Sequence, residues 1–172
     1  MPVSNDELAL SSRAARGDRH AFSILVRRHE ARVRSFLSRL AGAHAADDLA
    51  QEAFLRAWRH AGRFRGSGSY AGWLLAISWR VFLDAQKRDR VEQRRLNEVA
   101  TPDQNNLDPS ARIDVDTLFA ALDPDERAPL ALCLGQGWSH REAAEILAIP
   151  LGTLKSRLAR ATAKCRSMLE TG

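Results

Sequence analysis

The 172-residue chain has few of the residues that build stapled or fibrous folds. Two cysteines, Cys133 and Cys165, are too few for a disulfide framework and fit a reducing, cytoplasmic setting. Glycine (10) and proline (6) are sparse, which favours helices over sheet. No apolar run approaches the roughly 18 residues of a membrane span, and the acidic start, Met1 to Leu10, lacks a signal-peptide pattern. We therefore expect a cytoplasmic, helical protein with no membrane insertion.

Patterns for catalysis and metal binding are also missing. No Ser-His-Asp set, Gly-rich phosphate loop or carboxylate pair stands out, and no Cys or His pair has zinc-ligand spacing. The five histidines are scattered, at His20, His29, His44, His60 and His140. Cys133 and Cys165 fall on apolar helix faces, where small core residues are common. We expect no enzyme activity, no cofactor and no metal.

Charge is unevenly distributed along the chain. The net charge of +5 divides into +8 over residues 1–95, −7 over residues 96–126 and +4 over residues 127–172. Basic blocks are typical of proteins that bind a polyanion, although a solvated arginine-rich surface gives the same count. The 45% of hydrophobic residues is enough for one large core or two small ones and excludes wholesale disorder.

Helical spacing of apolar residues covers most of residues 1–95. A short helix is expected from about Ser4 to Arg16, and a longer one from the N-cap Asp18 to Gly42. A third helix, ending at Gly62, has an apolar stripe and an opposite polar face. That polar face carries Asp48, Gln51, Glu52, Arg56 and Arg59. Residues 63–69 are basic and rich in Gly and Ser, which predicts a flexible loop.

A helix expected from Tyr70 to Arg90 is apolar on two sides. One stripe contains Leu74, Ile77, Val81 and Ala85, and the other contains Leu75, Trp79 and Phe82. Such a helix either lies centrally in a core or has an apolar face with a separate role. Trp79, in the second stripe, is open between packing and an exposed aromatic surface.

Residues 96–112 have no apolar period and contain Pro and Asn, which predicts an acidic, flexible linker. A short helix is then expected from Asp114 to Leu122, and Asp123-Pro124 opens another that runs to Leu134. Ser139-His140-Arg141-Glu142 is a capping box that starts a third helix, and a fourth is expected from Leu151 to Leu169.

The segment from Ser139 to Arg166 has the pattern of a helix-turn-helix. In that motif the second helix enters the major groove of DNA. An ordinary helical hairpin with a solvated basic face is the alternative.

Motifs in a fixed order resemble a known family. Asp48-Leu49-Ala50-Gln51-Glu52-Ala53-Phe54-Leu55-Arg56-Ala57-Trp58, Phe64-Arg65-Gly66 and Trp73-Leu74-Leu75-Ala76-Ile77 resemble region two of bacterial RNA polymerase sigma factors of the extracytoplasmic-function (ECF) group. Trp138 to Leu169, with Pro150-Leu151-Gly152-Thr153-Leu154-Lys155-Ser156-Arg157-Leu158, resembles region four. The resemblance implies a transcription initiation factor with an all-α fold: a region-two-like domain (1–95), a linker (96–112) and a region-four-like helix-turn-helix domain (113–172).

The resemblance also implies roles for the first domain. The polar face around Asp48 would dock on the clamp helices of the polymerase largest subunit, while the flap of the second subunit is a further expected partner. The loop and helix after Phe64 would melt the minus-ten element and hold a base outside the stack. The residues expected to bind this DNA are Arg63, Arg65, Ser67, Gly68, Ser69, Trp79, Arg80, Lys87 and Arg88. Trp73 matches a family position that is mostly in the core, so the resemblance implies that it is buried. Arg80 stands where many members have Asn, which leaves base choice open. Asp84 matches an acidic position that is common in the group and is expected to orient a neighbouring arginine.

The second domain is expected to read the minus-thirty-five element through Thr153, Lys155, Ser156, Arg157 and Arg160. Two domains on a tether are compatible with an anti-sigma partner that covers both DNA-binding faces, as is common in the group. The alternatives are a homodimeric operator-binding regulator and an RNA-binding helical protein.

Overall fold

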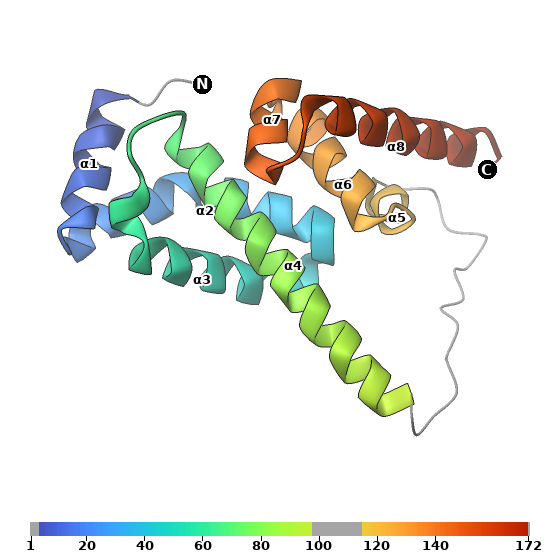
Figure 1. Cartoon of the computed structure of the whole chain (residues 1–172), viewed down its shortest axis with the longest axis horizontal. Coiled ribbons are helices and arrows are strands. Elements are labelled where there is room, and N and C mark those ends of the chain that lie inside the picture. The colour runs from blue at the N-terminus through green and yellow to red at the C-terminus, as the bar shows by residue number, and fades with distance from the viewer. Residues whose placement is uncertain (1–3, 98–114, 172) are drawn as a thin grey trace.

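The structure is a computed structural model that describes residues 4–97 and 115–171 (Figure 1). The regular elements of this part are all helical, which confirms the all-α prediction. They are α1 (Asn5–Ala15), α2 (Arg19–Ala41), α3 (Ala43–Arg59), η1 (Ala61–Arg63), α4 (Tyr70–Asn97), α5 (Val115–Ala120), α6 (Pro124–Leu130), η2 (Ala131–Gly135), α7 (His140–Leu147) and α8 (Leu151–Thr171). The expected acidic linker lies outside the described residues, except for residues 96 and 97 at the end of α4.

Helix starts follow the capping residues in the sequence. The Asp18 carboxylate accepts a hydrogen bond from the Ala21 N–H at 3.0 Å and begins α2. At α7, the Ser139 hydroxyl accepts from the Glu142 N–H, while the Glu142 carboxylate accepts from the Ser139 N–H at 3.0 Å. The predicted capping box is therefore confirmed, and it fixes where the helix-turn-helix begins.

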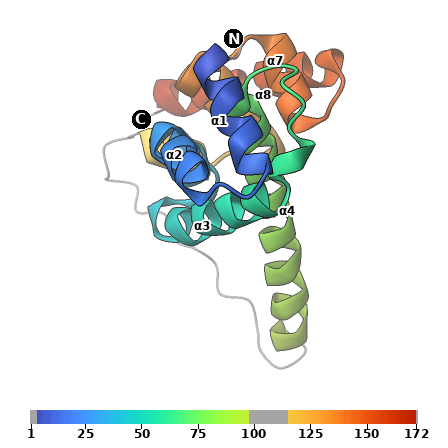
Figure 2. The same ribbon diagram turned by 90° about the vertical axis from the view of Figure 1, so that its left-hand side faces the viewer.

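Helix α2 is the centre of the fold. It packs against α1, α3 and α4, which belong to the N-terminal half of the chain, and against α5, α6 and η2, which belong to the C-terminal half. Its predicted apolar stripe is buried, with Leu25, Phe36 and Leu37 fully enclosed. Figure 2 shows α2 beside α1 and α3. The apolar cores of the two halves, residues 4–97 and 115–171, are continuous with each other.

Two elements differ from their predicted form. Helix α4 continues seven residues past Arg90 to Asn97, and this end extends away from the body in Figures 1 and 2. Its extension contains Val91, Glu92 and Arg95 but no Gly or Pro, so nothing in the sequence stops the helix. The helix that begins at Pro124 becomes a π-helical turn over Ala131–Gly135. Pro129 lies just before this turn and removes one backbone donor from the helix.

No helix in the described ranges combines the length and the apolar character that crossing a membrane requires. Cys133 and Cys165 are free and half-buried, and burial raises the pKa of both thiols.

The Tyr70 side chain lies in the core at the start of α4, and its hydroxyl has no hydrogen-bond partner among the described residues. A buried hydroxyl without a partner costs about 1–3 kcal/mol of desolvation. We therefore expect Tyr70→Phe to leave the free energy of unfolding unchanged or to raise it by about 1 kcal/mol, measured by urea denaturation. A loss of more than about 1 kcal/mol would show that the hydroxyl is bonded in solution.

Candidate nucleic-acid interface

The loop of residues 64–69 connects η1 to α4 and carries four of the nine predicted minus-ten residues, Arg65, Ser67, Gly68 and Ser69. Gly66 and Gly68 have φ values of +74° and +80°, a backbone conformation that favours glycine. Leu8 of α1 lies against the loop, since a Cβ added to Gly66 would approach its Cδ1 to 2.8 Å. At the other end, the Ser69 hydroxyl accepts a hydrogen bond from the Gly72 N–H at 2.9 Å and caps α4. The loop is thus fixed at both ends.

An aromatic cluster supports this loop from beneath. Tyr70 meets Phe64 edge to face, with ring centroids 5.0 Å apart, and lies 5.3 Å from the Trp73 ring. The His29 ring is 5.6 Å from the Tyr70 ring, and its Nε2 bonds the Glu7 carboxylate of α1 at 2.6 Å. Burial lowers the pKa of His29 despite this carboxylate. Sequence reasoning missed the Glu7–His29 pair because its members are 22 residues apart.

The two tryptophans of α4 differ in exposure. Trp79 is only 5% exposed and stacks on Phe82, with ring centroids 5.6 Å apart. Of the two alternatives for Trp79, the structure therefore shows packing, and the buried ring is not available to stack on DNA. The physical reason is that α4 packs against α2, α3 and α7, so both of its apolar stripes are covered. Trp73, which was expected to be buried, is half-exposed and lines a cavity beside Ser67 and Gly68.

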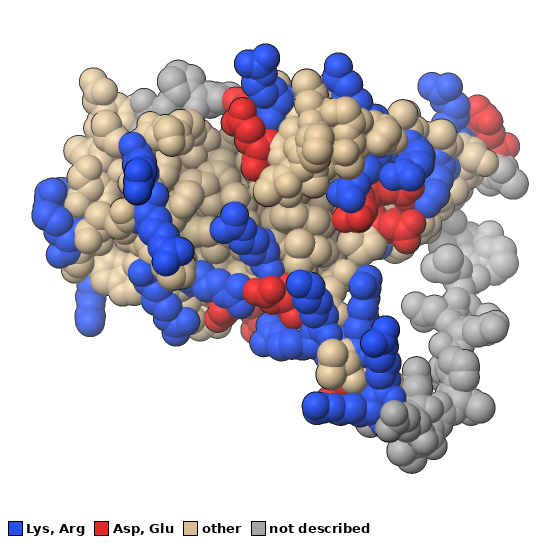
Figure 3. Space-filling model, in the orientation of Figure 1, with Lys and Arg blue, Asp and Glu red and all other residues tan. Residues whose placement is uncertain are grey.

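The predicted minus-ten cations are accessible. Arg63, Arg65, Arg80, Lys87 and Arg88 are all exposed. Figure 3 shows that basic side chains continue along the projecting end of α4. Asp84 pairs with an arginine, as predicted, and that arginine is Arg56 of α3. The Arg56 guanidinium holds the pKa of the Asp84 carboxyl below its usual range.

The predicted polymerase-binding face of α3 contains both paired and free side chains. Arg56 bonds Glu52 at 2.7 Å in addition to Asp84, so it ties α3 to α4. The remaining members of the face, Asp48, Gln51 and Arg59, are exposed. Leu55 lies among them and is 45% exposed. Sequence reasoning missed Leu55, although its place off the apolar stripe could have shown it. An apolar centre with a polar rim is the usual anatomy of a protein interface.

The helix-turn-helix consists of α7, a turn and α8. Ala148 ends α7 with a left-handed φ of 54°, while Ala143 and Ala144 are buried where the helices meet. Among the predicted minus-thirty-five residues, Lys155, Ser156 and Arg160 are exposed and Thr153 is half-exposed. These side chains lie on the outer side of α8, where a major groove could receive them.

Arg157 is held differently from its neighbours. Its side chain is 19% exposed, and its guanidinium bonds the Asp125 carboxylate of α6 at 2.8 Å. One and two turns further on, Arg160 and Lys164 face Glu126 of α6, at 3.9 and 2.6 Å. Figure 3 shows the acidic patch between these basic side chains. A role for Arg157 in reading DNA remains a prediction. In the structure, its guanidinium bonds Asp125 of the same chain.

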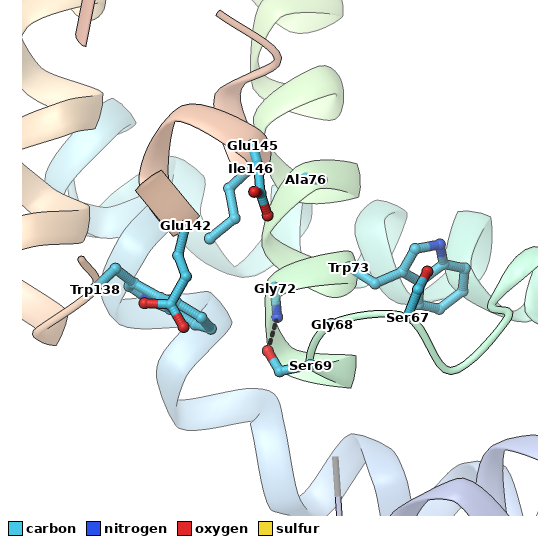
Figure 4. Close-up of a pocket in the computed structure, with 10 residues that line it drawn as sticks. All are labelled: Ser67, Gly68, Ser69, Gly72, Trp73, Ala76, Trp138, Glu142, Glu145 and Ile146. Atoms are coloured by element: carbon cyan, nitrogen blue, oxygen red, sulfur yellow. Dashed lines mark hydrogen bonds between the residues drawn. The ribbon is translucent and has the colours of Figure 1, made fainter. Parts of the chain in front are cut away.

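The two halves enclose a cavity of about 220 Å³ (Figure 4). Residues of the loop and of α4 form one wall, and residues of the C-terminal half form the other. The first wall contains Ser67, Gly68, Ser69, Gly72, Trp73 and Ala76, and the second contains Trp138, Glu142, Glu145 and Ile146. No cluster of metal-ligating side chains occurs in the part of the chain that the structure describes.

Comparison with known families agrees with this arrangement. The family model for Sigma-70 region 2 matches residues 25–91, and that for Sigma-70, region 4 matches residues 112–165. A loop-and-helix surface in one half and a helix-turn-helix in the other are thus the two conserved regions of a sigma factor. The chain belongs to the bacterial RNA polymerase sigma factors, in the ECF group.

Curated relatives and solved structures match along most of the chain. The ECF RNA polymerase sigma factor SigC of Mycobacterium tuberculosis is 34% identical over 166 residues, which cover 92% of this chain and 90% of that protein. The sigma-E factor of Escherichia coli is 32% identical and covers 88% of each chain. Two structures have a similar fold at a TM-score of 0.72. They are CnrH in complex with the cytosolic domain of CnrY (24% identity, 97% and 99% covered) and RpoE of Bartonella quintana in complex with the anti-sigma factor NepR (23%, 87% and 96%).

Substitutions at Gly66 and Gly68 can separate two effects on stability, namely a clash with Leu8 and the strain of a side chain at positive φ. Gly66→Ala and Gly68→Ala both place a side chain at positive φ, which costs about 1–2 kcal/mol. Only position 66 also meets Leu8. We expect Gly66→Ala to lower the free energy of unfolding by more than Gly68→Ala does, and the difference to disappear in a Leu8→Ala background, as measured by urea denaturation. Equal losses at both glycines in the parent chain would contradict the contact.

Proposed function

We propose that this chain binds core RNA polymerase through α3, opens the minus-ten element with the loop 64–69 and α4, and reads the minus-thirty-five element with α8. One observation carries the proposal: the regions that match Sigma-70 region 2 and region 4 are also those with exposed cations on the loop and α4 and on the second helix of the helix-turn-helix. Members of this family are transcription initiation factors rather than catalysts. A factor that acts with RNA polymerase at promoters would be located in the cytoplasm.

The chemistry of the loop suits a freed single strand. Arg63 and Arg65 are exposed and precede, by a few residues, the loop segment Ser67 to Ser69 that lines a cavity together with Trp73. Cations for phosphates and an aromatic ring for a base are the two features that single-strand binding uses. Ser67, Gly68 and Ser69 offer small side chains and main-chain groups at close range. Since Trp79 is buried, Trp73 is the tryptophan of α4 that is placed to stack on a base.

The helix-turn-helix offers two kinds of cation. Lys155 and Arg160 project from α8 and can reach phosphates or base edges without losing a strong partner. Arg157 must first leave Asp125, or contact DNA while it keeps that carboxylate. We therefore assign the principal contacts to Lys155, Ser156 and Arg160, with Arg157 acting as a bridge between α8 and α6.

Control by an anti-sigma factor is part of the proposal. The solved structures with a similar fold, which describe sigma factors in complex with CnrY and with NepR, support it. A partner of this kind would cover the promoter-facing surfaces of both halves.

Run-off transcription tests the proposed function. The full chain is added to core polymerase with sheared DNA of the source genome, and the transcripts are mapped by their 5′ ends. We expect starts at a shared pair of upstream elements that core polymerase alone does not use. Tight, polymerase-independent binding of a homodimer to DNA, without new transcripts, would favour a conventional operator-binding regulator instead.

Substitutions in α8 separate DNA contacts from packing. Lys155→Ala should weaken promoter binding by the holoenzyme and reduce the slope of log affinity against log salt by about one, because one phosphate contact is lost. The free energy of unfolding should not change. Arg157→Ala should instead lower the free energy of unfolding, by about 1 kcal/mol or less because Asp125 is exposed. If Lys155→Ala left both affinity and salt slope unchanged, α8 would not contact DNA at this position.

A further inference from the structure

We propose that the chain has a binding site for a small phosphate-bearing anion at the corner where α2 ends and α3 begins. The site lies in a cavity of about 280 Å³ between this corner and the helices α5 and α6. Its lining includes Ser38, Arg39, Gly42 and Ala43 from the corner, and Phe119 and Arg127 from α5 and α6. These residues belong to none of the predicted surfaces for DNA or polymerase, so the inference does not depend on the proposed function.

Two arginines bring unbalanced positive charge to the cavity. Arg39 and Arg127 are half-buried, none of the residues that line the cavity is acidic, and neither guanidinium has a carboxylate partner among the described residues. Burial lowers the pKa of Arg127 despite the Asp123 carboxylate nearby. Buried charges in proteins are normally paired, because an unpaired charge loses its solvation by water. An anion in the cavity would balance both arginines.

Each arginine also keeps a buried donor. The Nε atoms of Arg39 and Arg127 are buried and have no hydrogen-bond partner among the described residues. The terminal nitrogens of Arg127 donate to the main-chain carbonyls of Leu40, Ala120 and Leu122, at 2.5, 3.0 and 2.7 Å. These bonds fix the guanidinium without neutralising it, because a carbonyl carries no net charge. Unpaired buried donors in a native structure commonly mark the place of a water or an ion.

The Arg39 side chain is held in one position. Its guanidinium lies over the Phe119 ring, 5.1 Å from the centroid. Gly135 lies against the same side chain, since a Cβ added there would be 3.3 Å from the Arg39 Nε. A side chain fixed in this way loses little conformational entropy when a ligand binds. The planar fork of guanidinium donors matches the oxygens of a phosphate group.

The start of α3 adds a second source of positive potential. Gly42 and Ala43 line the cavity, and α3 has neither a side-chain cap nor an acidic residue in its first turn. The free N–H groups and the macrodipole at a helix N-terminus favour phosphate. The Ser38 hydroxyl offers a further donor on the same wall. The helix terminus and the two arginines therefore favour the same kind of ligand.

The size of the cavity limits the class of ligand. Pockets for drug-sized molecules measure roughly 300–1,000 Å³, whereas this cavity measures about 280 Å³. It suits one or two phosphate groups. Inorganic pyrophosphate and the diphosphate of a nucleotide share this chemistry, and separate titrations distinguish them.

Thermal unfolding of the full chain in inorganic pyrophosphate, at constant ionic strength, tests the site. We expect Tm to rise by about 5 °C or more at ~100 times the dissociation constant, because the ligand binds only the folded chain. Arg39→Gln should abolish this rise. Arg27→Gln, which removes the same charge from an exposed position of α2, should keep it. No rise in the parent, or an equal rise in Arg39→Gln, would overturn the proposal, because the anion would then bind elsewhere on the basic surface or not at all.

Adenosine diphosphate in the same titration identifies the form of the ligand. Tighter binding than that of pyrophosphate would support a nucleotide, and weaker binding would support an inorganic anion. Both results support the site if Arg39→Gln abolishes them, and a response to either compound that is independent of Arg39 counts against it.

Ala43→Glu provides a test that leaves both arginines in place. Ala43 is exposed at the start of α3 and lines the cavity, so a carboxylate there would repel the anion and compete for its position. We expect the affinity for pyrophosphate, measured by isothermal titration calorimetry, to fall about tenfold or more. His44→Glu adds a carboxylate in the same turn but outside the lining of the cavity, and should change the affinity by about twofold at most because solvent screens it. Equal losses in both variants, or no loss in Ala43→Glu, would overturn the proposal.

Discussion

Hydrogen bonds to two main-chain carbonyls of α2 attach the C-terminal half of the chain to the N-terminal half, and the rest of the structure depends on this attachment. Leu40 lies in the last turn of α2, where a carbonyl has no partner within the helix, and Arg127 supplies the missing donor. Arg32 lies mid-helix, and its carbonyl accepts an additional bond from Gln136. Because α2 is also the centre of the N-terminal core, these bonds attach the C-terminal half to the most rigid part of the fold. Because of this attachment, α7 lies opposite the loop 64–69.

The cations of the chain divide into those used in folding and those left for partners. Arg56, Arg157 and Lys164 are bonded to carboxylates of neighbouring helices, and each joins two elements. Arg63, Arg65 and Lys155 are exposed on the surfaces that match the conserved regions of sigma factors. Acidic residues of α6 bond Arg157 and Lys164, and they also line a cavity with Lys87 and Arg90 of α4. Net charge alone could not show this division, because the acidic middle of the chain cancels part of the positive charge of the two basic blocks.

Features with a local cause were predictable from the sequence. The caps at Asp18 and Ser139 depend on residues within one helical turn, and the structure has both. The partial exposure of Trp73 and the burial of Trp79 were not predictable, because periodicity shows that α4 has two apolar stripes but not which one a distant helix covers. The Arg157–Asp125 pair joins residues 32 apart in sequence. Family resemblance gave the two domains and their order, but it could not give the contacts between them.

The choice of main-chain acceptors has a consequence for how the interface can change over evolutionary time. A carbonyl is present at positions 32 and 40 whatever side chains stand there, so α2 can vary in sequence without losing either acceptor. The donors, by contrast, are the side chains of Gln136 and Arg127 on the opposite half. The hydrogen bonds across the interface therefore depend on side chains of the C-terminal half alone. Single substitutions there can change the strength of the interface, whereas the buried stripe of α2 is constrained by its packing in the core.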